Sequence, residues 1–151
     1  MRKLFWLMAL VAAPSIMQAQ QDAYVELLRS DVKTQRVAII TEVMQFSDSA
    51  SAVFWPIYRE YELDASKVGD DMLALIKDYA ANYDTLSEEM AKDLASRALK
   101  IDEEELKLRK KYFKKVEKAL GSVTAAKFLQ IENQIRLLID LQIAQSLPLI
   151  Q

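Results

Sequence analysis

Apolar residues recur every three or four positions over most of this chain, which is the period of an amphipathic α-helix. In the clearest run the apolar positions alternate between steps of four and three residues, as in a heptad seam. Its members are Phe54, Tyr58, Tyr61, Ala65, Val68, Met72, Leu75 and Tyr79. The run predicts one helix of about 30 residues, which would extend for roughly 45 Å.

Three further helices follow from weaker stripes of the same period. They are expected from about Asp22 to Gln45, from the end of a turn to about Leu120, and from Gly121 or Ser122 to about Gln145. Their apolar positions are Val25, Leu28, Val32, Ile39 and Val43, then Met90, Leu94, Ala98, Ile101, Leu108, Tyr112 and Val116, then Phe128, Ile131, Ile135 and Leu138. No segment alternates as a half-buried strand does. The predicted fold class is therefore all-α with four helices, two of which form a long antiparallel hairpin about residues 82–86.

Local signals place the helix ends. In the turn NYDTLSEE, Thr85 with Glu88 fits a capping box, and Ser87 is a competing cap. Gly121 is expected as a left-handed C-terminal cap. Pro56 lies eight or nine residues after a helix start at Ser47 or Asp48, where it would break a helix interior. We therefore expect Pro56 to act as a kink or as the first residue of the long helix.

The beginning of the chain has the layout of a secretory signal peptide. Arg2 and Lys3 precede the apolar run LFWLMALVAA, which is too short to span a bilayer. Cleavage after Ala19 would leave residues 20–151 as a single exported, periplasmic domain without stable membrane insertion. Losing the two basic residues changes the formal net charge from −2 to −4. This mild acidity argues against nucleic acid as a partner.

The composition excludes much chemistry. The chain has no histidine and no cysteine, so it lacks the common general base, thiol nucleophile and zinc ligands. No glycine-rich loop follows a strand, and no cofactor is expected. The acidic run IDEEELK would fan around a helix, which favours a solvated face over a metal site. We expect a protein that is not an enzyme and holds no metal.

One strongly basic segment, KLRKKYFKKVEK, interrupts the third predicted helix. Its candidate residues for binding a client or partner are Lys107, Arg109, Lys110, Lys111, Phe113, Lys114, Lys115 and Lys118. One interpretation is an exposed helix face with Tyr112 and Val116 turned to the core. The other is a basic surface with an adjacent aromatic ring that binds acidic, partly unfolded proteins or an acidic partner domain.

Two stretches of sequence 74 residues apart share a helix-start pattern. The first reads FSDSASAVFWPI from Phe46, and the second reads LGSVTAAKFLQI from Leu120. In each, a large apolar residue precedes a cap, and a phenylalanine follows one or two turns later. The motif positions are Phe46, Ser47, Ala50 and Phe54 in the first copy and Leu120, Thr124 and Phe128 in the second. Two similar helix starts indicate a repeated helical architecture.

This pair of stretches resembles the motif Leu-Thr-x-x-Gln, which occurs twice in the Spy/CpxP family of small periplasmic proteins. FSDSA has Phe46 for leucine and Ala50 for glutamine, and LGSVT has Gly121 for threonine and Thr124 for glutamine. The resemblance covers nearly all of the exported chain in helix order and spacing. It implies four helices whose long hairpin pairs into an elongated, curved homodimer.

The resemblance also implies a function. Some members of the family hold unfolding clients without ATP, and others damp envelope-stress sensor kinases. We therefore expect a homodimeric holding chaperone or stress-response accessory that binds non-native proteins. The alternative is a regulatory protein that binds the periplasmic domain of a sensor receptor. A helical adaptor resembling Skp is a third hypothesis, which the acidic balance and the short hairpin fit poorly.

Overall fold

The computed structural model describes residues 34–150. The chain divides into two compact units, Met1–Ile39 and Ile40–Gln151, and the fold reported below is that of the second. The expected signal peptide over residues 1–19 and the expected first part of the first helix lie outside the described residues.

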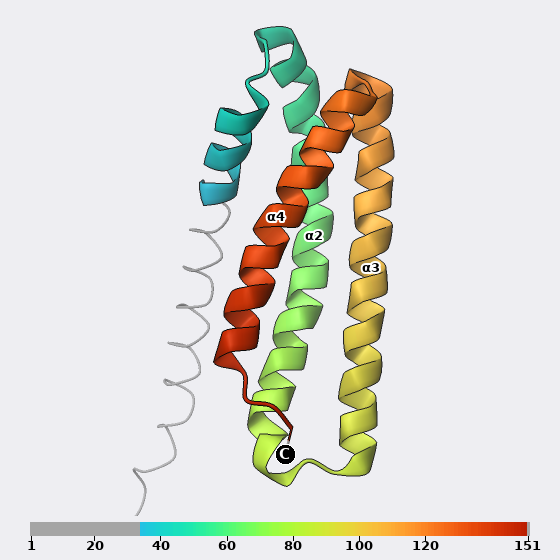
Figure 1. The fold of residues 1–151 in the computed structure, drawn as a ribbon. Helices are drawn as coiled ribbons and strands as arrows, with labels where there is room; N and C mark the ends of the chain where they lie inside the picture. Colours follow the sequence, from blue (N-terminus) through green and yellow to red (C-terminus); the bar gives the residue numbers. More distant parts are fainter. Residues whose placement is uncertain (1–33, 151) are drawn as a thin grey trace, which may run out of the picture. The chain divides into compact units, whose positions relative to one another are not determined.

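The described residues are almost entirely helical (Figure 1). Residues 34–44 are helical, and three long helices follow: α2 (Asp48–Asn82), α3 (Glu88–Leu120) and α4 (Ser122–Ser146). A short 3₁₀ helix, η1 (Tyr83–Thr85), connects α2 with α3. Residues 34–150 contain no strand. The prediction of an all-α fold with four helices is therefore confirmed.

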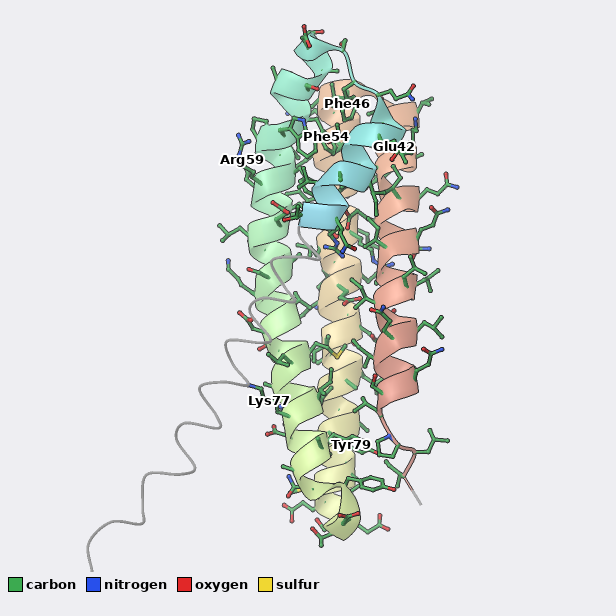
Figure 2. All side chains as sticks on the ribbon, turned by 90° about the vertical axis from the view of Figure 1, so that its left-hand side faces the viewer. Glu42, Phe46, Phe54, Arg59, Lys77 and Tyr79 are labelled. Atoms are coloured by element: carbon green, nitrogen blue, oxygen red, sulfur yellow. The ribbon has the colours of Figure 1, made fainter. Side chains whose placement is uncertain are left out.

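The start of α2 combines a side-chain cap with an aromatic contact. The Ser47 side chain accepts a hydrogen bond from the backbone N–H of Ala50 at 3.3 Å, which satisfies one of the free donors at a helix N-terminus. The ring of Phe46, the residue before the cap, lies 4.6 Å from the ring of Phe54 (Figure 2). This contact fixes the direction in which the chain enters α2.

Pro56 is not the first residue of the long helix. α2 is one helix from Asp48 to Asn82, and Pro56 lies inside it. Proline has no N–H, so the carbonyl of Ala52 loses its partner four residues ahead. The helix start predicted at Pro56 was wrong because Phe54 and Tyr58, on either side of the proline, are both buried and their packing outweighs the local propensity. The alternative, a kink at Pro56, stays a prediction.

The caps between the helices differ from the prediction in detail. Ser87, not Thr85, caps α3, because its side chain accepts from the N–H of Met90 at 3.2 Å. Thr85 belongs to η1 instead. Gly121 ends α3 with φ 86° and ψ 161°. The positive φ agrees with the expected glycine cap, but this ψ lies outside the left-handed helical region, in a region that glycine alone adopts readily.

α2 and α3 pack side by side in antiparallel directions. Ion pairs between them join Asp78 with Arg97, Asp64 with Lys111, and Glu60 with Lys115. The residue numbers therefore decrease along α2 as those of their partners increase along α3. α4 runs parallel to α2: Tyr58 and Tyr61 contact Glu132, and the Tyr79 hydroxyl donates to the Pro148 carbonyl at 2.7 Å beyond the end of α4.

Aromatic side chains from three helices form the centre of the core. The Phe128 ring of α4 meets the rings of Phe54, Tyr58 and Tyr61 of α2 at 5.6–6.2 Å. Tyr112 of α3 packs against Tyr61 at 5.3 Å. Edge-to-face pairs of this kind add stability beyond the burial of their area. One carboxylate, Glu132, is buried with them, at 2 % exposure.

The predicted stripes of α2 and α3 face inward, while two other predictions were wrong. No member of the α2 or α3 stripe is exposed. On α4, Leu138 is 63 % exposed although it was assigned to the buried stripe. In the helix over residues 34–44, Ile40 and Met44 are buried, whereas the predicted Ile39 and Val43 are exposed. The assignment of that first stripe was therefore one residue out of register.

Candidate functional site

The basic segment of α3 is divided between two surfaces of the helix. Lys111 and Lys115 face α2, whereas Arg109, Lys110, Phe113 and Lys114 line a groove beside α4. The two remaining candidates lie on neither surface: Lys107 pairs with Glu103 along α3 at 3.8 Å, and Lys118 is exposed. Sequence reasoning treated these eight residues as one surface, but the helical period separates them.

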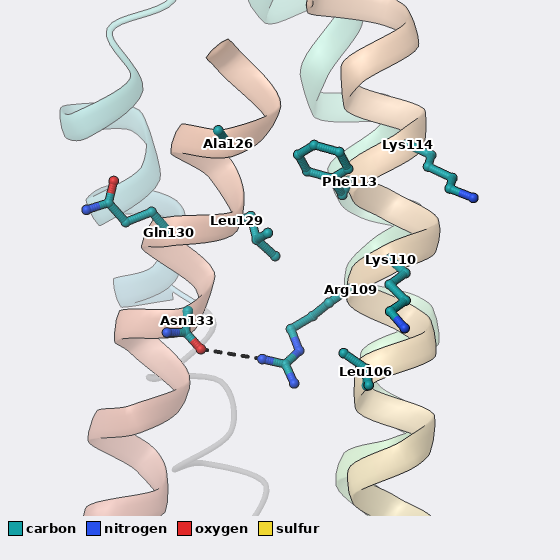
Figure 3. Close-up of a pocket in the computed structure, with 9 residues that line it drawn as sticks. All are labelled: Leu106, Arg109, Lys110, Phe113, Lys114, Ala126, Leu129, Gln130 and Asn133. Atoms are coloured by element: carbon teal, nitrogen blue, oxygen red, sulfur yellow. Dashed lines mark hydrogen bonds between the residues drawn. The ribbon is translucent and has the colours of Figure 1, made fainter. Parts of the chain in front are cut away.

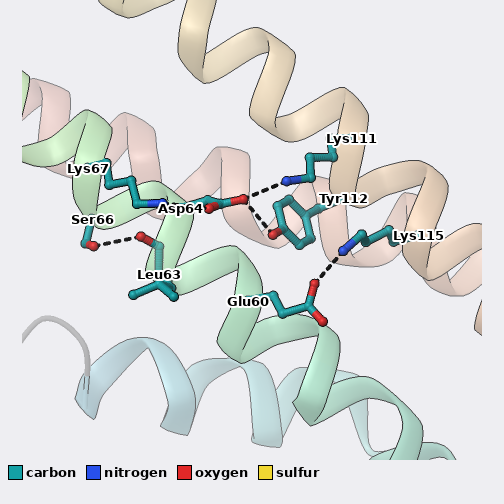
Figure 4. Close-up of polar contacts among 8 residues, drawn as sticks. All are labelled: Glu60, Leu63, Asp64, Ser66, Lys67, Lys111, Tyr112 and Lys115. Atoms are coloured by element: carbon teal, nitrogen blue, oxygen red, sulfur yellow. Dashed lines mark hydrogen bonds and ion pairs between the residues drawn. The ribbon is translucent and has the colours of Figure 1, made fainter.

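The α2-facing surface is an ion-pair network centred on Asp64 (Figure 4). Its carboxylate accepts from Lys111 Nζ at 2.7 Å, from the Tyr112 hydroxyl at 2.8 Å and from Lys67 Nζ at 3.3 Å. The Lys111 hydrogen bond contributes most to holding the pKa of Asp64 well below its usual range, followed by those of Tyr112 and Lys67. The same bond to Asp64 raises the pKa of Lys111.

Two of the candidate cations belong to the contact between α3 and α2. Lys115 pairs with Glu60 of α2. Lys111 and Lys115 also lie over the Tyr112 ring, 5.0 and 5.1 Å from its centroid. Burial raises the pKa of Tyr112, and its hydrogen bond to Asp64 adds to the shift. We therefore assign Lys111 and Lys115 a role in the packing of the helix pair, and their role in binding a partner stays a prediction.

The second surface is a groove of about 570 Å³ between α3 and α4 (Figure 3). α3 contributes Leu106, Arg109, Lys110, Phe113 and Lys114, and α4 contributes Ala126, Leu129, Gln130 and Asn133. Phe113 and Leu106 extend from α3 toward α4, where Leu129 faces them, and Lys110 and Lys114 lie along the α3 side. The volume is in the range of ligand-binding clefts.

Two cations of the groove, Lys110 and Lys114, are not neutralised by carboxylates of the described residues. Lys110 and Lys114 form no ion pair with any described residue. Arg109 donates to the neutral amide oxygen of Asn133 at 3.4 Å, and its Nε is buried with no hydrogen-bond partner in the described part of the chain. No residue that lines the groove is acidic. The groove therefore combines apolar walls with an uncompensated positive charge.

A polar cluster surrounds Arg109 and Asn133, two of the residues that line the groove. Asn133 accepts from Arg136 Nη2 at 3.1 Å as well as from Arg109, and Arg136 is ion-paired with Asp140 one turn further along α4. Glu105 of α3 lies near these groups. Burial, and then the negative charge of Asp140, raise the pKa of Glu105, while Arg136 and Arg109 act against the shift.

Sequence reasoning missed the α4 wall of the groove and Leu106. Leu106 lies seven residues before Phe113, so both fall on one face of α3, a face distinct from the predicted core stripe. Leu106 is 46 % exposed. The seven-residue spacing of Leu106 and Phe113 could therefore have predicted the α3 side of the groove from the sequence. The α4 wall carried no such signal, because Ala126, Gln130 and Asn133 are ordinary residues for a solvated helix face.

The repeated helix-start residues are structural in this fold. Ser47 caps α2, and the main chain of Ala50 receives that cap. Phe54 and Phe128 are buried in the aromatic core. Leu120 is the last residue of α3, and α4 begins after Gly121 without a side-chain cap. Thr124 is partly buried in the first turn of α4. None of these seven residues lines the groove.

Within residues 34–150, no three His, Cys, Asp or Glu side chains are grouped as a metal site would require. In the same range, no helix has the length and apolar character needed to cross a bilayer.

Comparison with known proteins gave no match: no family model, no curated protein and no solved structure is similar to this chain.

Proposed function

We propose that this protein is an exported, ATP-independent holding chaperone, or an accessory protein of the envelope stress response, that binds non-native proteins in the groove between α3 and α4. The observation that carries the proposal is the combination of apolar walls and unpaired cations at one place. Leu106, Phe113 and Leu129 offer apolar contact, and Lys110 and Lys114 offer charge without a counter-ion among the described residues.

The chemistry of this groove suits weak, reversible binding. Exposed apolar side chains are shielded only when another apolar surface covers them. Cations on the rim speed the approach of acidic segments and add little to the lifetime of the complex. A holding chaperone needs this combination, because it must capture a client quickly and release it without ATP.

An aggregation assay tests the proposal. The purified protein is added to reduced or heated clients without ATP, and light scattering is recorded. We expect suppression at stoichiometric ratios, and weaker suppression as the salt concentration rises, because salt screens exposed charges. No suppression across several acidic clients would refute the chaperone function.

Paired variants connect that result to the groove. Lys110→Glu with Lys114→Glu reverses the charge of the groove, whereas Lys92→Glu with Lys100→Glu makes the same change in net charge elsewhere on α3. We expect the first pair to lose suppression and the second to retain it. Equal loss in both would assign the effect to net charge instead of the groove.

A regulatory function is the second candidate, because a groove with uncompensated lysine charge could also fit one specific acidic partner. In that case the partner is the periplasmic domain of one sensor receptor. A pull-down that returns a single receptor domain, displaced by Lys110→Glu, together with no protection of clients, would favour this function over the first.

The proposal includes a homodimer. Leu137, Leu138 and Leu141 of α4 are each more than half exposed, and a second copy is one way to cover them. Size-exclusion chromatography with light scattering gives the mass in solution. A monomer at all concentrations would remove the dimer from the proposal and leave the groove in place.

A further inference from the structure

We infer that the groove between α3 and α4 takes an acidic amphipathic helix, bound in helical form, and not an extended segment. The inference deepens the proposed function and rests on the same groove, because it names the class of segment that a client or partner would present there. It follows from the spacing of the apolar residues, the spacing of the cations and the absence of acidic residues in the lining.

The apolar spacing matches a helix. Leu106 and Phe113 are seven residues apart on α3, which places them about 10.5 Å apart along the helix axis. A partner helix repeats its apolar positions over the same seven residues and the same distance. In an extended segment, side chains on one face recur about every 6.6 Å. Neither one nor two such steps equals the distance between Leu106 and Phe113.

The cation spacing places acidic residues on the flank of that helix. Lys110 and Lys114 are four residues apart, or about 6 Å along the α3 axis. Carboxylates four residues apart on a partner helix have this same spacing. Both lysines lie on the α3 side of the groove (Figure 3). One apolar ridge flanked on one side by glutamate or aspartate therefore fits the groove.

The opposite wall is suited to close contact. α4 contributes the small Ala126 and the neutral Gln130 and Asn133 beside Leu129. Small side chains let a partner backbone approach, and the two amides can hydrogen-bond polar groups at its edge. The nearest acidic residue further along α3, Glu117, accepts a hydrogen bond from the Ser122 hydroxyl at 2.8 Å and does not line the groove.

The experiment measures binding of three designed peptides to the purified protein by fluorescence anisotropy. The first peptide has about two heptads with leucine at the seam and glutamate on one flank. The second carries a central proline in the same composition, and the third carries lysine for glutamate. We expect the first to bind and to gain helical circular dichroism when bound. We expect the other two to bind at least about tenfold more weakly.

Variants place the peptide in the groove. Lys110→Glu with Lys114→Glu should raise the dissociation constant about tenfold or more, and Lys92→Glu with Lys100→Glu should change it less than about twofold. Leu106→Ser should weaken binding, whereas Leu63→Ser, an equally polar change at an exposed leucine of α2, should not. Helical circular dichroism of each variant confirms that it folds.

Three outcomes would overturn the inference. The proline peptide binding as tightly as the first would show an extended ligand. Equal binding of the lysine peptide would remove the charge argument. A protein dimer that Leu106→Ser dissociates would assign the groove to a second copy of this chain. Failure of the chaperone function is distinguishable from all three: clients would aggregate unprotected while the acidic helix still bound in the groove.

Discussion

The rings of Phe54 and Phe128 pack edge to face with their centroids 5.7 Å apart. They hold the same place in the two repeated stretches. The next turn of each helix repeats the relationship, because Tyr58 donates to Glu132 across the same separation of 74 residues. α2 begins at Asp48 and α4 at Ser122, again at that offset. The two stretches therefore start helices that pack in parallel and in register, with equivalent residues in contact.

The buried carboxyl group of Glu132 accepts a hydrogen bond from each of two tyrosine hydroxyls. Tyr61 donates at 2.8 Å and Tyr58 at 3.3 Å. Removing a hydrogen bond to a buried polar group leaves part of that group's desolvation penalty uncompensated and costs about 1–3 kcal/mol. We expect Tyr61→Phe to lower the free energy of unfolding by about this amount, and Tyr58→Phe by less, because its bond is longer. Urea denaturation measures both.

Tyr79→Phe is the control for that comparison. Its hydroxyl donates to the Pro148 carbonyl in an exposed setting, where water can replace the lost partner, so the change should cost about 1 kcal/mol or less. An equal loss in all three variants would contradict the special role of the buried carboxylate.

The sequence was sufficient for the helices because their signals are local and repeated. The heptad of α2, the stripe of α3 and the position of Gly121 each follow from neighbouring residues. The core carboxylate did not follow, because Glu132 looks like a solvated residue until Tyr58 and Tyr61 are placed opposite it. The division of the basic segment was also invisible, since it depends on Asp64 and Glu60 of another helix.

Gly121 makes possible the sharp connection between α3 and α4. Its φ of 86° with ψ of 161° is strained for any residue with a Cβ, although nothing lies within 4 Å of the place a Cβ would take. We expect Gly121→Ala to lower the free energy of unfolding by about 1–3 kcal/mol through backbone strain alone. Thermal and urea unfolding measure the change.

Gly69→Ala is the matched control, with the opposite sign. Gly69 lies inside α2 with open space around it, so alanine should stabilise the protein by about 1 kcal/mol. Destabilisation at Gly69, or no effect at Gly121, would contradict the assigned backbone conformations.

Pro56 should reduce the stability of α2. It is exposed, and it leaves the Ala52 carbonyl without its helical partner. Pro56→Ala restores that hydrogen bond but gives the unfolded chain more freedom, and we expect a net gain of about 2 kcal/mol in the free energy of unfolding. Pro148→Ala, outside any helix, should change it little. A loss of stability in Pro56→Ala would contradict the cost assigned to the missing hydrogen bond.

The contribution of Glu105 to the free energy of unfolding should become more favourable as the pH falls. Burial raises its pKa in the folded state, so the folded protein binds this proton more tightly than the unfolded chain does. The ionised carboxylate therefore costs stability above the folded pKa, and that cost disappears as the pH falls to about 4. Glu105→Gln should be more stable than the parent at pH 7, with a difference that shrinks on acidification. Urea unfolding at both pH values tests the sign.

Asp64 should have the opposite pH dependence. Its pKa is lowered in the fold, chiefly by the hydrogen bond from Lys111, so the unfolded chain binds the proton more readily. The stability it contributes is present above the unfolded pKa of about 3.9 and is lost as the pH falls from there toward the folded value. Asp64→Asn should therefore lower the melting temperature at pH 7, and the gap from the parent should narrow below about pH 4. A gap that stays constant down to pH 2 would show that the Asp64 carboxylate charge does not hold α3 against α2.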